Sequence, residues 1–196
     1  MERSPWHAGE IEMQARIGVS ERMEVLGRRV IRDHMPDQHR SFYEQLPFMV
    51  YGAVDADGKP WASLLEGEPG FVHSPEPQLL HFSSRPAADD PAQLSDGSAI
   101  GLLGIELHTR RRNRINGHIG AMSASGFDVT VDQSYGNCPQ YIQLRQFRSV
   151  PLTDPATRPA QHFNELDDAA KVMIAEADTF FVASYVDVEG VRSVDV

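Results

Sequence analysis

The chain has 196 residues, 41% of them hydrophobic and 23% charged, which is enough for one globular domain of ordinary size. Its 28 Asp and Glu residues outnumber its 18 Lys and Arg residues, and the net charge of −10 excludes a general nucleic-acid-binding protein. The single Cys138 excludes an internal disulfide framework, and no apolar run has the length of a signal peptide core or of a membrane span. A cytoplasmic protein that binds neither nucleic acid nor membrane is therefore expected.

Residues 1–44 are expected to form an N-terminal helical segment that serves as an outer layer or lid. Apolar residues in 9–29 recur at a helical spacing that is interrupted at Gly18, which predicts two short helices, the second capped by Ser20. Asp37 is expected to cap a further helical turn that runs to Gln45.

Residues 45–150 have the spacing of a β domain. Segments 48–54 and 60–66 flank an Asp-Gly turn and predict a β-hairpin, and residues 127–133 alternate apolar and polar side chains. Short strands are also expected at 71–73 and 78–82, with a helical turn at 92–94. About six strands at short spacing predict a mainly β fold with peripheral helices, arranged as a small antiparallel barrel.

The most unusual stretch is 109–118, which contains four arginines after an apolar run at 99–108 that predicts a buried strand. Asn116-Gly117 predicts a tight turn at its end. Two interpretations remain open: the arginines form an anion site, or they protect a solvated edge strand from pairing with another sheet.

A short helix is predicted at 138–145, with Asn137 as its N-cap. Cys138 would then be either a reactive thiol at a helix N-terminus or a buried, inert cysteine. Residues 151–176 are expected to be a linker rich in Pro and Thr, followed by a helix that Asn164 caps.

Residues 177–196 are expected to be the start of a second, incomplete barrel. Segment 180–190 repeats segment 48–58 without a gap, with Phe, Val, Val, Asp and Gly at matching positions. The sequence leaves two explanations open. Either the chain belongs to a protein with a second barrel, or its last strand completes the sheet of another chain.

Three stretches together resemble the pyridoxamine 5'-phosphate oxidase-like, FMN-binding split-barrel proteins: 60–72, the arginine-rich stretch that ends at Gly117, and 137–143. The similarity is strongest to a bacterial branch that carries two such units in tandem. This resemblance implies a six-stranded Greek-key split β-barrel, a homodimer with FMN at the subunit interface, and oxidoreductase chemistry in which hydride or electrons pass through FMN. It implies a small-molecule substrate or electron donor as the other partner.

The resemblance also implies which residues contact the cofactor. The matching positions are Ala62, Ser63, Leu64, Ser83, Ser84, Arg85, Arg114 and Asn116. The C-terminal Arg and His motif of pyridoxamine phosphate oxidases has no counterpart before Val196, which argues against vitamin B6 oxidation, and Asp89 and Asp90 would repel a phosphate in the loop that follows Arg85.

Several single residues are also candidates for the site. Arg85, Arg112, Arg114 and Arg145 are candidates for a phosphate, with surface ion pairing as the alternative for each, and Trp61 or Tyr135 could stack on a flavin ring or fill the core. His108 and His118 flank the arginines and could join an anion or haem site, whereas no spacing predicts a metal site. The alternative function is a non-catalytic dimeric module that has lost flavin or binds haem or another ligand.

Overall fold

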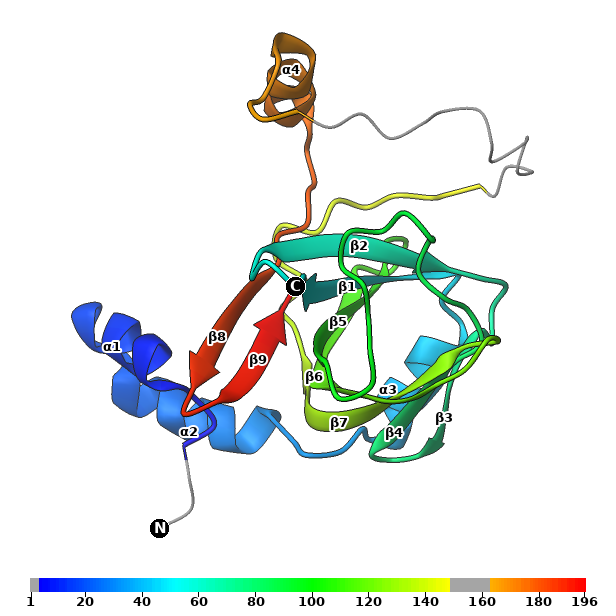
Figure 1. The fold of residues 1–196 in the computed structure, drawn as a ribbon. Coiled ribbons are helices and arrows are strands. Elements are labelled where there is room, and N and C mark those ends of the chain that lie inside the picture. Colours follow the sequence, from blue (N-terminus) through cyan, green and yellow to red (C-terminus); the bar gives the residue numbers. More distant parts are fainter. Residues whose placement is uncertain (1–3, 149–162) are drawn as a thin grey trace.

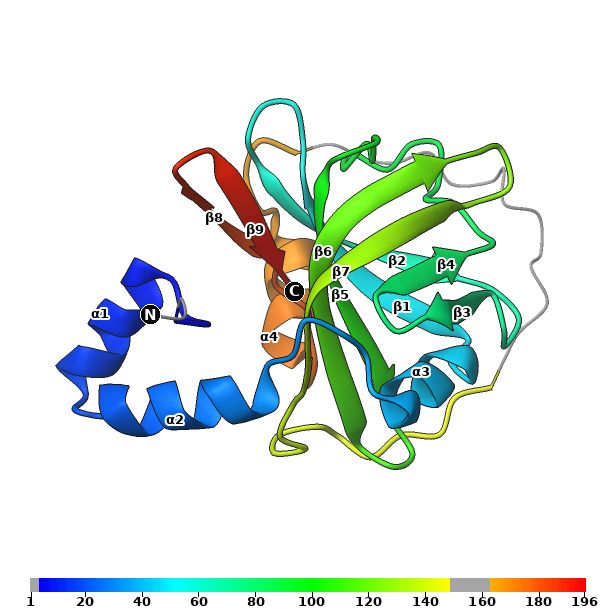
Figure 2. The ribbon, with the colours of Figure 1, turned by 90° about the horizontal axis from the view of Figure 1, so that it is seen from below.

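Three helices precede the sheet in the computed structural model, which describes residues 4–148 and 163–196. They are α1 (Ala8–Arg16), α2 (Ser20–Val30) and α3 (Asp37–Glu44), which confirms the predicted helices in this part of the chain. Helices α1 and α2 stand beside the sheet, and α3 packs against one end of it (Figures 1 and 2). The predicted caps are wrong, because Ser20 and Asp37 are the first helical residues and neither helix has a side-chain cap.

The fold is mainly β and is built on one antiparallel sheet with the strand order β2-β1-β5-β6-β7-β4-β3. The seven strands are β1 (Phe48–Val54), β2 (Pro60–Glu66), β3 (Val72–Glu76), β4 (Leu79–Phe82), β5 (Ala99–Glu106), β6 (Arg111–Met122) and β7 (Phe127–Gly136). Six strands were expected. The additional one is β6, because the arginine-rich stretch is itself a strand.

Strand β6 lies in the middle of the sheet, where β5 and β7 pair with its two edges. Asn116 pairs with Gly101 on one side and Gln133 on the other, so the predicted turn at Asn116-Gly117 is wrong. The chain turns instead just before β6, where Arg110 has a φ of 58°. Pairing on both sides also excludes the edge-strand interpretation of the arginines. The same tertiary pairing overrides the local preference of Asn116-Gly117 for a turn.

The β1–β2 hairpin matches the prediction to the residue. Asp55 explains it: its Oδ1 accepts hydrogen bonds from the backbone N–H groups of Asp57 and Lys59, and its Oδ2 accepts one from Trp61 Nε1 at 2.8 Å. Gly58 takes the positive φ of 80° that the turn requires.

The register divides the sheet residues between two faces, because directly paired residues point to the same side. Tyr51, Leu102 and Ile115 point into the main core, where the rings of Phe82 and Phe127 stack with centroids 4.7 Å apart. We call this side the inner face of the sheet.

The opposite side, here named the outer face, carries Val50, Leu103 and Arg114 in one row across β1, β5 and β6. Val50 and Leu103 form a second, smaller apolar cluster with Val196. The end of the chain therefore packs against this face.

Three elements follow the strands of the large sheet: α4 (Asp168–Glu176), β8 (Ser184–Val188) and β9 (Val191–Asp195). Helix α4 buries no residue and projects from the body of the molecule (Figure 1). Strands β8 and β9 form a separate hairpin, and β9 lies across the outer face.

Glycine on β5 permits this close approach of β9. A Cβ atom at Gly101 would lie 2.5 Å from the carbonyl oxygen of Val194, a separation that no side chain tolerates. Val194 is 1% exposed in this position. The C-terminal hairpin is thus a packed part of the fold.

Some predicted local features are wrong. No helix forms at 138–145, where Cys138 is exposed and free rather than buried or at a helix start, and no helical turn forms at 92–94. Asp167, rather than Asn164, caps α4 by accepting a hydrogen bond from Ala170 N at 2.7 Å. The predicted linker at 151–159 lies outside the described residues, and the division into domains remains a prediction.

Candidate functional site

Four of the eight predicted cofactor residues lie on the outer face. Leu64, Val50, Leu103 and Arg114 form one row across β2, β1, β5 and β6. Ala62 and Asn116 end the adjacent row, which passes through Gly52 and Gly101. The sheet therefore aligns residues that lie about 50 positions apart in the sequence.

A cavity of about 370 Å³ opens on this face beside Arg112 and Arg114. Its apolar wall includes Leu103 and Ile105 of β5, and the segment that leads to β8 contributes Phe180. The volume is within the usual range for a small-molecule site. We call it the outer-face pocket. Its lining also includes Leu107, Gln140, Tyr141, Ile142, Gln143, Asp178, Thr179, Phe181, Val182 and Val196.

The two arginines of the outer-face pocket have donors without acceptors. The Nε atoms of Arg112 and Arg114 are buried and make no hydrogen bond within the described residues. Arg112 does donate through Nη2 to the carbonyl oxygen of Cys138 at 3.0 Å. Burial, and then the neighbouring Arg114, lower the pKa of Arg112, although a guanidinium remains charged at any physiological pH. Two adjacent cations with free donors favour an anion.

One carboxylate of the chain already approaches this site. Asp195 Oδ1 accepts hydrogen bonds from Asn116 Nδ2 at 3.1 Å and from the Tyr135 hydroxyl at 3.0 Å. It lies 3.9 Å from Arg114 Nη1. Burial, and then the charge of Asp195, raise the pKa of Tyr135. A C-terminal acid therefore partly neutralises the predicted anion site.

The other predicted residues lie elsewhere. Ser63 pairs with Tyr51 and so lies on the inner face, and Ser83 donates through Oγ to the carbonyl oxygen of Phe71 at 3.2 Å. Ser84 has a buried Oγ without a hydrogen-bond partner in the described chain. The structure thus separates these residues and Arg85 from the outer-face group.

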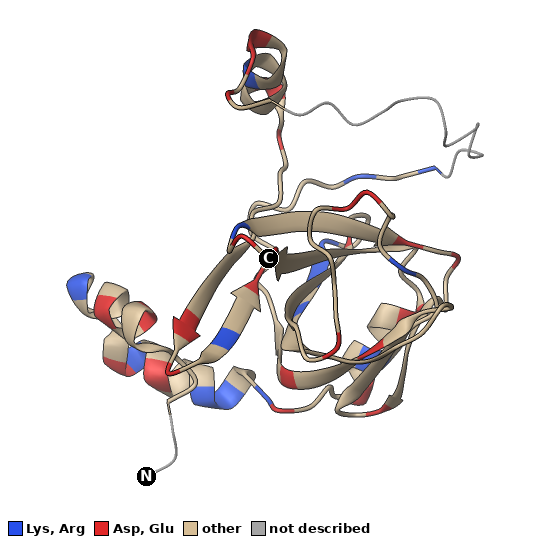
Figure 3. Cartoon of the chain, viewed as in Figure 1, with Lys and Arg blue, Asp and Glu red and all other residues tan. Residues whose placement is uncertain are grey.

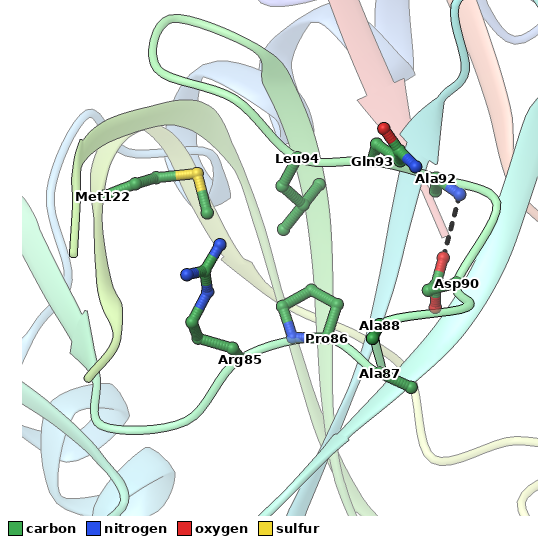
Figure 4. A pocket seen from close by; sticks show the side chains of 9 residues that line it. All are labelled: Arg85, Pro86, Ala87, Ala88, Asp90, Ala92, Gln93, Leu94 and Met122. Atoms are coloured by element: carbon green, nitrogen blue, oxygen red, sulfur yellow. Dashed lines mark hydrogen bonds between the residues drawn. The ribbon is translucent and has the colours of Figure 1, made fainter. Parts of the chain in front are cut away.

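Arg85 lines a second cavity, of about 460 Å³, in the loop after β4. Figure 4 shows its guanidinium beside Leu94 and Met122, while Asp90 accepts a hydrogen bond from the backbone N–H of Ala92 at 2.9 Å. This loop pocket therefore contains one cation and one acid. It is a weaker site for a phosphate dianion than the outer-face pocket.

The remaining candidate residues, Arg145, Trp61, His108 and His118, line neither of these two pockets. Arg145 forms an ion pair with Asp178, and the Trp61 indole is held by Asp55. His118 contacts Asp132 at 2.6 Å, whereas His108 lies in the turn before β6. His108 precedes Arg111, the first residue of β6, and the seven positions of extended strand from Arg111 to His118 span about 23 Å. The two histidines therefore cannot hold one ligand.

Sequence patterns could not reveal the role of Asp195, because its contact with Asn116 joins residues 79 positions apart. Nothing in the sequence around Asp195 indicates that its side chain contacts Asn116. Among residues 4–148 and 163–196, no group of three or more His, Cys, Asp or Glu is arranged to hold a metal ion. No helix in the same ranges is long and apolar enough to cross a membrane.

One comparison with known proteins identifies a family. The family model for pyridoxamine 5'-phosphate oxidase matches residues 35–153, a range that includes α3 and all seven strands of the large sheet. No curated protein sequence matches the chain significantly.

Two solved structures are similar at low sequence identity. One is a candidate pyridoxamine 5'-phosphate oxidase from Lactobacillus delbrueckii, with 12% identity and a TM-score of 0.41 over 53% of this chain and 95% of that one. The other is a HupZ variant from group A Streptococcus, with 11% identity and a TM-score of 0.41 over 53% of this chain and 99% of that one.

Proposed function

The chain belongs to the pyridoxamine 5'-phosphate oxidase family, whose model matches more than half of it, and from this premise we propose that it is an FMN-binding oxidoreductase. The observation that carries the proposal is the outer-face pocket, where Arg112 and Arg114 present unpartnered Nε atoms beside an apolar wall. A flavin mononucleotide has the matching chemistry, since it joins a phosphate dianion to a flat, largely apolar ring.

Arg112 and Arg114 would hold the phosphate through charge-assisted hydrogen bonds, with the Asn116 amide as a further donor. Phe180 and Tyr141 would cover the apolar part of the ligand and exclude water from it. When bound, FMN would supply the capacity to accept and donate hydride or electrons, so the protein needs no acid-base pair of its own.

We assign the phosphate to the outer-face pocket rather than to the loop pocket, because Asp90 lines the loop pocket beside Arg85. Burial, and then this carboxylate, raise the pKa of Tyr51. Ser63, Ser83 and Ser84 would accordingly support the fold around the loop and make no contact with the phosphate.

A homodimer is part of the proposal. Helix α4 exposes Val172, Met173 and Ile174 and buries nothing in the described chain, so a contact with a second copy would cover apolar surface that is otherwise wet. Sedimentation velocity of the purified protein is expected to give twice the mass of one chain. A monomer at tens of micromolar would contradict this part of the proposal alone.

Titration with FMN tests the cofactor assignment. FMN fluorescence is expected to be quenched on binding at one FMN per chain, and Arg114→Gln is expected to weaken binding about tenfold to a hundredfold because a charged hydrogen bond is lost. Arg85→Gln is the matched control, since it removes the same charge from the loop pocket. Binding that depends on Arg85 and not on Arg114 would move the phosphate to the loop pocket and refute the assignment.

A second candidate function, a binding module without flavin, is favoured by one contact. Asp195 already supplies a carboxylate to Asn116 and Tyr135 and lies near Arg114, so the anion site could be satisfied within the chain. The two functions differ in one result. Asp195→Asn is expected to tighten FMN binding in the flavoprotein, whereas neither form of a module without flavin would bind FMN.

A further inference from the structure

A third cavity lies at the end of the sheet where the β5–β6 turn meets α3, and the flavin proposal does not use it. Its volume is about 230 Å³. The three successive arginines Arg110, Arg111 and Arg112 line it, together with Asn113 and with Gln38 and His39 from the first turn of α3. We call it the turn pocket.

The turn pocket is positively charged and contains no acid. No Asp or Glu lines it, and within the described ranges none of its three arginines is joined to a carboxylate. Glu106 pairs with Arg111 across β5 and β6 and accepts the hydroxyl hydrogen of Thr109, and its charge offsets part of the charge of Arg111. Three arginines beside this one carboxylate leave a net positive charge for a ligand.

The guanidinium groups of Arg111 and Arg112 are held in place before any ligand binds. The Arg111 guanidinium lies 4.9 Å from the centroid of the Phe42 ring, which fixes its position over an aromatic face. Arg112 is fixed by its bond to the Cys138 carbonyl oxygen. Because these side chains are already ordered, binding loses less conformational entropy.

A buried donor in the turn pocket lacks a partner. Asn113 is 7% exposed, and its Nδ2 makes no hydrogen bond within the described chain. A buried amide without an acceptor costs free energy that a ligand oxygen would recover. His39 Nδ1 is already bonded to Ser134 Oγ at 3.0 Å, so only the other ring nitrogen is left to meet a ligand.

We propose that the turn pocket binds a small phosphate-bearing anion, either inorganic phosphate or a short phosphomonoester. Phosphate oxygens accept hydrogen bonds from guanidinium and amide donors, which are the groups that this pocket provides. The N-terminus of α3 also borders the pocket, and Asp37 in its first turn offsets part of the positive end of the helix dipole. The volume is smaller than that of a flavin site, so the two sites take different ligands, although Arg112 borders both.

Calorimetric titration in a low-salt buffer without phosphate tests the proposal, with inorganic phosphate and glycerol 3-phosphate as separate probes. Arg111→Gln and Arg110→Gln are each expected to weaken binding by about tenfold or more. Arg29→Gln on α2 is the matched control and is expected to change binding by less than about twofold. A heat signal for either probe identifies which source of phosphate the pocket accepts.

Two titration results would overturn the proposal. One is no binding of either probe at about 10 mM. The other is binding that Arg114→Gln abolishes while Arg111→Gln leaves it intact, since the anion would then occupy the outer-face pocket. A second readout guards against a variant that misfolds: phosphate is expected to shift the backbone amide resonances of 109–113 in the wild-type protein, and the absence of such shifts on binding would also refute the site.

Discussion

Gly101→Ala tests whether the C-terminal hairpin is docked on the outer face as described. The new Cβ atom would lie 2.5 Å from the carbonyl oxygen of Val194. An ordinary contact between carbon and oxygen needs about 3.4 Å, so β9 must move by about 1 Å. A backbone carbonyl cannot rotate away, and the hairpin is therefore expected to lift from the sheet.

The size of the effect follows from what the hairpin buries. Val194 and Val196 are 1% and 4% exposed, and full burial of a valine is worth about 1.5–3 kcal/mol. A shift that loosens both without exposing them fully is expected to cost about 2 kcal/mol. For a chain of this length that corresponds to a decrease in Tm of about 4–8 °C.

Hydrogen exchange measures this change where it occurs. Amides of β8 and β9 are expected to exchange faster in Gly101→Ala, while amides of β5 and β6 keep their rates. Gly120→Ala is the matched control, because its Cβ would lie 3.4 Å or more from any neighbouring atom. Equal exchange of β9 in the wild type and in both variants would refute the docking of the hairpin.

Three further predictions concern the core, the pH response and the cysteine. Phe127→Ala is expected to lower the free energy of unfolding by about 3–5 kcal/mol in denaturant titrations because it removes a buried, stacked ring, whereas the same change at the exposed Phe180 should cost less than about 0.5 kcal/mol. Burial, and then the charges of Arg32 and Arg111, lower the pKa of His39 below its ordinary value of 6.5. Between these two pKa values His39 is protonated in the unfolded chain and neutral in the folded one, so the free energy of unfolding should fall as the pH decreases from above 6.5 toward the lowered pKa. His39→Gln should reduce that loss of stability. An equal loss in both proteins would contradict the account. Cys138 is exposed and should react with one equivalent of a thiol reagent without denaturant. Reaction only after unfolding would contradict this prediction.

Local turn chemistry explains which parts of the fold the sequence could predict. The β1–β2 hairpin was predicted to the residue because Asp55 and Gly58 are adjacent in the chain to the strands that they join. The two N-terminal helices were predicted from a spacing that needs no tertiary partner to be recognised. The predicted caps of α2 and α3 were wrong because Val19 and Pro36, which have no side chain able to cap, occupy the N-cap positions.

Tertiary pairing explains what could not be predicted. Asn116-Gly117 has the local preference of a turn, yet both residues pair with β5, and the whole strand is fixed between two neighbours. Segment 138–145 has a plausible cap, but its residues are almost all exposed, so no packing stabilises a helix there.

Only part of the candidate site can be predicted from the sequence, because its assembly also depends on tertiary pairing. Arg114 and Asn116 stood out by residue type, and their alignment with Ala62 and Leu64 depends on the register of four strands. Asp195 reaches them from the far end of the chain, and no local pattern carries that contact.

FMN binding by the purified protein tests the central claim most directly. Absorbance near 450 nm, or quenching of added FMN at one equivalent per chain that Arg112→Gln with Arg114→Gln abolishes and Arg85→Gln leaves intact, is the result that we predict. No flavin bound at tens of micromolar FMN, with the protein shown to be folded by the hydrogen exchange of β5 and β6, would contradict the claim.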